Sequence, residues 1–147
     1  MWARFNQSTR CVKGLFSYES CFRWYVGEII DRMVEEKVMY AELRPMMLDK
    51  YMPSDDGSRK IGLVEQMSII SEEIARKRSE MEWRGSSDDL PFGLKIIYCT
   101  PRSVSKTTLA SELQDCLMLK RKFPDLICGN TITTSLSPHH RPFGVSL

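Results

Sequence analysis

Residues 19–45, ESCFRWYVGEIIDRMVEEKVMYAELRP, carry the decisive pattern of the sequence. Within 19–37 the apolar side chains recur every three or four residues, which predicts an amphipathic helix with one buried face. The following run, 38–45, is apolar and ends at a proline, which has no backbone donor, so it predicts a short strand. A helix that leads directly into a buried strand is typical of α/β proteins.

The same alternation continues along the chain. The expected elements are a helix near the start, over 2–12, and, after a polar turn at 53–58, a helix over 59–82, a strand over 93–99, a helix over 107–123 and a strand over 126–129. Because helices alternate with short apolar strands, we expect a parallel sheet with helical crossovers. Three strands are few for such a sheet, which normally has both faces and both edges covered, so the sheet is expected to be incomplete.

Composition narrows the classes of partner. The 147 residues include 21 Lys and Arg against 19 Asp and Glu, a net charge of +2. This near-neutral balance gives no electrostatic reason to expect nucleic acid or an anionic membrane as a partner. The opening residues MWARFNQSTR lack the basic-then-apolar layout of a signal peptide. We therefore expect neither of these partners, and no secretory signal in this chain.

Metal-ligating residues are scarce. The five cysteines match no zinc-finger spacing. The two histidines, His139 and His140, are adjacent, so they cannot share one face of a helix or strand, and we expect them to be solvated. They lie in 130–147, a Ser-, Thr- and Pro-rich segment without a helical or strand period, which we expect to be a disordered tail behind a domain at 1–129.

Charged residues at the ends of the expected strands are the main candidates for function. Glu42 and Arg44 are two residues apart, so they point to the same side of the sheet. Two explanations stand: a structural ion pair, or a ligand site at the carboxyl end of the strand, where α/β proteins carry their sites. The same argument applies to Arg102, which follows the second strand.

Three segments together resemble one family. VKGLFSYESCFRWYVGEIIDRMVEEKVMYAELRP, PFGLKIIYCTPR and LKRKFPDLICG occur in an order and at a spacing that are similar to the adenosine deaminase family, in its growth-factor-related branch. The resemblance runs from Trp2 to Gly129. It implies a zinc-dependent (β/α)8 barrel that deaminates adenosine hydrolytically to inosine, and a branch whose members are typically extracellular.

The resemblance also assigns residues. It implies that 38–43, 94–99 and 126–129 are the second, third and fourth barrel strands. It places Trp2, Ala3, Arg4 and Phe5 against the substrate, with Trp2 and Phe5 as apolar walls for a purine. Glu42, Arg44, Arg102 and Gly129 are then structural residues at strand ends.

The departures from the family pattern shape the functional prediction. The strands that carry the family's three zinc histidines, its aspartates, its catalytic glutamate and its water-side histidine have no counterpart in this sequence. We therefore expect a fragment of a purine nucleoside deaminase that binds no zinc and is inactive alone. The abrupt change after Gly129 points to a truncated product or a misread gene. The alternative is a non-catalytic α/β protein that associates with itself or with an intact homologue through open sheet edges.

Overall fold

The decisive stretch forms both elements that its pattern predicts. Helix α2 spans Glu19–Glu35 and strand β1 spans Tyr40–Leu43. The helix ends because Lys37 adopts a left-handed backbone conformation, with φ of 58°, and its amide donates to the carbonyl of Val34 at 3.0 Å. This is a common way for a helix to satisfy its last carbonyl groups.

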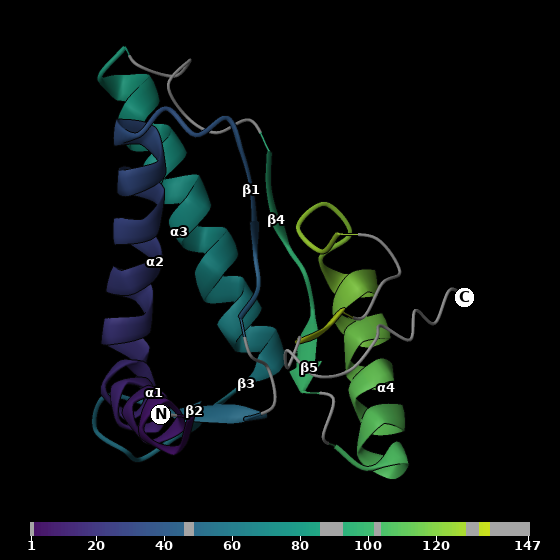
Figure 1. Ribbon diagram of the computed structural model, residues 1–147. Helices are drawn as coiled ribbons and strands as arrows, with labels where there is room; N and C mark the ends of the chain where they lie inside the picture. Colours follow the sequence, from purple (N-terminus) through teal and green to yellow (C-terminus); the bar gives the residue numbers. More distant parts are fainter. Residues whose placement is uncertain (1, 46–48, 86–92, 102–103, 129–132, 136–147) are drawn as a thin grey trace. The chain divides into compact units, whose positions relative to one another are not determined.

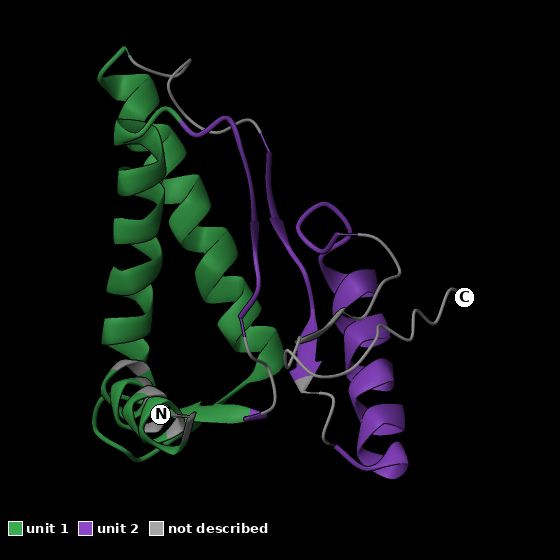
Figure 2. Ribbon diagram, in the orientation of Figure 1, with its two compact units in different colours: residues 1–37, 51–90 green, residues 38–50, 91–147 purple. Residues whose placement is uncertain are grey.

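The computed structural model describes residues 2–45, 49–85, 93–101, 104–128 and 133–135 (Figure 1). The chain divides into two compact units, and each is discontinuous in sequence (Figure 2). Unit 1 comprises 1–37 and 51–90, and unit 2 comprises 38–50 and 91–147. No helix of the described ranges is both long and apolar enough to cross a bilayer.

Unit 1 is a set of helices joined to one hairpin. Its elements are α1 (Trp2–Phe16), α2, β2 (Tyr51–Pro53), β3 (Lys60–Gly62) and α3 (Leu63–Trp83). Strands β2 and β3 pair antiparallel, with Met52 opposite Ile61. These two side chains and Ile69 are buried together, and Phe22 packs against them. This cluster fixes the hairpin between α2 and α3 because each element contributes one apolar side chain to it.

The hairpin corrects one expectation. The sequence predicted a helix from residue 59, whereas α3 begins at Leu63. Residues Lys60–Gly62 are used instead as strand β3. Pairing with β2 buries Ile61 completely, an apolar gain that outweighs one further helical turn. A three-residue strand is too short for its period to be visible in the sequence.

Unit 2 contains the parallel pairing. Its elements are β1, β4 (Gly93–Ile96), β5 (Cys99–Pro101), α4 (Lys106–Lys122) and β6 (Thr133–Ser135). Strands β1 and β4 run parallel, with Tyr40 opposite Gly93 and Leu43 opposite Ile96. The other edge of β4 forms a single parallel bridge from Ile96 to Ile127. The order β1, β4, Ile127 is therefore a parallel sheet that narrows to one bridge.

The fold class is mixed α/β, as expected, but the strands differ in detail. The described residues form three two-stranded sheets and no closed barrel. The strand expected over 93–99 is divided into β4 and β5, and the one expected over 126–129 is reduced to the bridge at Ile127. Within 130–147, Thr133–Ser135 forms β6, which pairs with β5 in parallel. Gly129 and the rest of that segment, including His139 and His140, lie outside the described residues.

Helix α4 buries a face that matches the expected one only in part. The apolar spacing over 107–123 predicts that Leu109, Leu113, Cys116 and Leu117 point inward. Cys116 is buried and Leu113 is half-buried, but Leu109 and Leu117 are exposed. The buried residues are Glu112, Cys116 and Leu119, which share one face because they are four and three residues apart. The buried face of α4 therefore differs from the apolar pattern and includes a glutamate. A buried carboxylate is costly unless it is paired, so the partners of Glu112 have to be identified.

Candidate functional site

The four residues that the family resemblance places against a purine all lie in the first turn of α1, in unit 1. Ala3, Arg4 and Phe5 are exposed, and Phe5 keeps 59% of its surface accessible. An exposed aromatic ring beside a guanidinium group can stack on a planar ligand. Their role as a purine wall stays a prediction.

The strand-end residues are in unit 2. Along β1 the exposed and half-buried side chains alternate, so Tyr40 and Glu42 share the exposed face. The Tyr40 hydroxyl donates to Glu42 Oε1 at 2.8 Å, and the Cys128 thiol donates to the same oxygen at 3.8 Å. The hydrogen bond to Glu42, together with partial burial, raises the pKa of Tyr40 to about 12. The contacts of Glu42 are thus a phenol and a thiol, while Arg44 lies exposed just beyond the strand.

Two further predicted residues, Arg102 and Gly129, lie outside the described residues. The structure therefore places the candidates in separate units or leaves them undescribed. Thr100, in β5, is a residue that sequence reasoning missed. Its hydroxyl is buried and has no hydrogen-bond partner within the described part of the chain, which is unusual for a buried polar group.

A buried ionic cluster in unit 2 was also missed. Glu112 is 1% exposed, and its Oε2 accepts a hydrogen bond from the Tyr98 hydroxyl at 2.6 Å. Its Oε1 pairs with Lys50 Nζ, which also pairs with Asp115. One signal in the sequence could have indicated that Glu112 is buried: it lies four residues before Cys116, so both side chains are on the same face of the helix.

The electrostatics of this cluster follow from its burial. Burial, followed by the hydrogen bond to Glu112, raises the pKa of Tyr98. Burial alone would lower the pKa of Lys50, but its hydrogen bonds to Asp115 and Glu112 outweigh this effect and raise it. The cluster therefore holds Tyr98 neutral and Lys50 charged across the neutral pH range.

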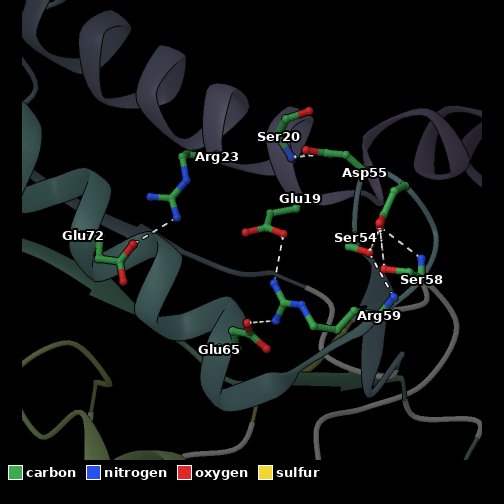
Figure 3. Close-up of polar contacts among 10 residues, drawn as sticks. Glu19, Ser20, Arg23, Ser54, Asp55, Ser58, Arg59, Glu65 and Glu72 are labelled. Carbon is green, nitrogen blue, oxygen red and sulfur yellow. Dashed lines mark hydrogen bonds and ion pairs between the residues drawn. The ribbon is translucent and has the colours of Figure 1, made fainter.

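Unit 1 carries a second polar cluster, around the N-terminus of α2 (Figure 3). Asp55, in the hairpin loop, accepts from the amide of Ser20 at 2.9 Å, which caps a helix whose own N-cap residue, Tyr18, supplies no side-chain bond. Arg59 lies between Glu19 and Glu65 and pairs with both. These contacts join the loop to α2 and α3, so a structural role explains the cluster.

The loop itself is held by Asp56. Its carboxylate accepts from the Ser54 hydroxyl at 2.6 Å and from the hydroxyl and amide of Ser58. The hydrogen bonds from Ser54 and then Ser58 lower the pKa of Asp56 to about 2. All donors are local, as in an Asx turn.

The donor set for a metal is insufficient in the described residues. No group of three His, Cys, Asp or Glu side chains within them is arranged to hold an ion. A zinc site needs at least three protein ligands, usually including histidine or cysteine. The described residues therefore do not fit the zinc that the family resemblance implies.

Comparison with known proteins supports the resemblance. Adenosine deaminase 2 from Pongo abelii and from Homo sapiens is in each case 25% identical over 129 residues, and adenosine deaminase 2-A from Danio rerio is 23% identical over 129 residues. The chain is a distant homologue of part of adenosine deaminase 2. The match covers 88% of the chain but only 23%, 23% and 24% of these relatives. No protein-family model and no solved structure matches the chain.

Proposed function

We propose that this chain is part of an adenosine deaminase-like hydrolase and contains the second to fourth strands of a (β/α)8 barrel. The observation that carries the proposal is the order of the parallel strands: β4 lies between β1 and Ile127. In a barrel of this kind, consecutive strands are neighbours and a helix connects each to the next. Here α3 separates β1 from β4 in sequence, and α4 separates β4 from Ile127.

The intact enzyme would take adenosine or a related purine nucleoside and release ammonia by hydrolysis. Zinc would activate the water in that enzyme. The described residues offer no zinc site, so the proposed part of this chain is the barrel wall: the first turn of α1, with Trp2, Ala3, Arg4 and Phe5, on the substrate side, and Glu42 and Arg44 at a strand end. The chain alone binds no zinc and is inactive.

Sequencing of the gene and its transcript tests the assignment to a longer enzyme. A His-x-His strand upstream and a stretch with the catalytic glutamate and further histidines downstream, both in frame with this chain, support it. A correctly spliced message that continues from Gly129 into Asn130 and Thr131 overturns the idea that the segment 130–147 replaces barrel sequence.

A binding experiment tests the role of α1 without requiring turnover. Adenosine is titrated against the labelled chain, with uridine as the control nucleoside. Shifts of the amide signals of residues 2–5 with adenosine, which Phe5→Ala weakens and Leu15→Ala on the same helix does not, support the purine wall. Equal shifts with both nucleosides contradict it. An assay with adenosine and added zinc should show no inosine, and turnover above background would refute the inactivity.

A second candidate is self-association without catalysis. Strand β1 pairs with β4 on one edge, and no other strand of the described ranges pairs with it. An unpaired edge is a template for strand addition from a second chain. Light scattering after gel filtration over a wide concentration range tests this. A monomer at every concentration excludes it.

A further inference from the structure

The buried carboxylate of Glu112 connects two segments that leave the same edge of the sheet. Lys50 belongs to the segment that follows β1, and Tyr98 lies directly after β4. Both side chains donate to the carboxylate of Glu112, in the middle of α4: the Lys50 ammonium to Oε1 and the Tyr98 hydroxyl to Oε2. Since β1 and β4 are parallel neighbours, Lys50 and Tyr98 both follow the carboxyl ends of adjacent strands.

We propose that Lys50 is a positioning residue. Together with Tyr98 and Glu112 it forms a clamp that fastens to α4 the two segments leaving the carboxyl ends of β1 and β4. The proposal rests on the proposed function in one respect, that the carboxyl ends of parallel strands are where an α/β enzyme holds its ligand. The clamp keeps that edge in one arrangement before any ligand binds.

The charges explain why a lysine is needed. A buried carboxylate without a cation is costly, and one with a cation and a neutral donor is satisfied. Tyr98 supplies only the neutral donor, and Asp115 adds a second negative charge beside Glu112. Lys50 pairs with both carboxylates and offsets one of their two negative charges. Its side chain is 35% exposed, so the ammonium group reaches from a partly exposed position to the buried carboxylate of Glu112.

Nuclear magnetic resonance of side-chain ammonium groups tests the ion pair directly. An ammonium held by two carboxylates exchanges its protons slowly, so Lys50 should give a signal at neutral pH that exposed lysines lack. Glu112→Gln should broaden that signal strongly. Lys106, exposed at the start of α4, provides the control. Absence of a protected Lys50 signal in the unmodified chain overturns the proposal.

Amide exchange then separates positioning from simple neutralisation of charge. Lys50→Met should speed exchange of the Ile97 amide, which lies beside Tyr98 and donates to the Leu43 carbonyl at 2.9 Å, by about tenfold or more, while Lys106→Met should not. The double variant Lys50→Met, Glu112→Gln removes the buried charge together with its cation, so it should refold normally yet keep the fast exchange. Lys50→Arg should restore slow exchange.

Each outcome is decisive. If the double variant regains slow exchange, Lys50 only neutralises Glu112 and the clamp is wrong. If Lys50→Met leaves exchange unchanged, it is wrong as well. Neither readout uses adenosine or zinc, so failure of the deaminase assignment would leave the clamp standing, and failure of the clamp would leave the assignment untouched.

Discussion

Among the described residues, each unit buries one glutamate on the inner face of a helix, and the two are satisfied in different ways. In unit 1, Glu73 on α3 is 3% exposed and pairs with Arg76, three residues later on the same helix. In unit 2, Glu112 on α4 is 1% exposed, and its partners Lys50 and Tyr98 are 62 and 14 residues away. One carboxylate therefore has a local partner and the other has only tertiary ones.

Because the partners differ, the two units are sensitive to different substitutions. The side chain of Arg76 is 55% exposed, so removal of Glu73 would return its guanidinium group to water at little cost. The hydroxyl of Tyr98 is buried, so removal of Glu112 would leave it without a partner. A second feature of Glu73 is its contact with Gly27 on α2, where an added Cβ would come within 2.6 Å of Oε1.

The largest expected effect separates the two glutamates. Glu112→Met should lower the free energy of unfolding by about 2–4 kcal/mol, since it leaves a buried hydroxyl unsatisfied and an ion pair broken. Glu73→Met should change it by less than about 1 kcal/mol. Urea unfolding followed by circular dichroism measures both. Equal losses would show that local and tertiary partners are equivalent here.

A pair of glycines sharpens the comparison from the side of Glu73. Gly27→Ala should destabilise by about 1–2 kcal/mol, because the methyl group displaces a buried carboxylate and outweighs the better helix propensity. Gly14→Ala, on α1, has nothing within 4 Å and should stabilise by about 0.5–1 kcal/mol. Thermal melting measures both changes. A stabilising Gly27→Ala would mean that Glu73 is not fixed by its local partner.

High pH should lower the stability of unit 2. The pKa of Tyr98 is raised in the folded chain from the ordinary value of 10.0, so its contribution is complete below about pH 10 and is lost as pH rises further. Lys50, whose pKa is also raised, acts in the same direction. The urea midpoint should therefore begin to fall near pH 10 and keep falling as the pH rises further, and Tyr98→Phe should make the fall shallower.

Tyr40 provides the control for this pH dependence. Its hydrogen bond to Glu42 is on the exposed face of β1, so Tyr40→Phe should alter the fall at high pH less than Tyr98→Phe does. A fall that neither substitution changes would show that the alkaline loss arises outside the Glu112 cluster.

The smallest expected effect is a loss of stability of unit 1 at low pH. The pKa of Asp56 is lowered from 3.8 to about 2 by its serine donors. Its contribution is therefore present above about pH 4 and is lost as pH falls toward 2. Asp56→Asn should flatten this acid limb of the stability curve, and Ser54→Ala should move it to higher pH. An acid limb that neither substitution changes would exclude the loop as its source.

Several features were predictable because they depend on neighbours in sequence. The helix that became α2 follows from apolar spacing over 19–37, and the end of β1 is set within two residues by Pro45. The last turn of α4 carries the three basic residues that complement a helix C-terminus. Pairing partners were not predictable in the same way, because a three-residue strand such as β3 carries no usable period.

The residues alone were enough to predict an α/β chain of alternating helices and short strands, with a near-neutral charge and a resemblance to part of a larger enzyme. Tertiary structure alone decided that residues 38–50 join 91–147 in one unit, that α4 turns Glu112 inward, and that Lys50 is its cation. The physical reason is that the free energy of a buried charge depends on which groups surround it. For Glu112 those groups come from other parts of the chain, and only folding brings them within hydrogen-bonding distance.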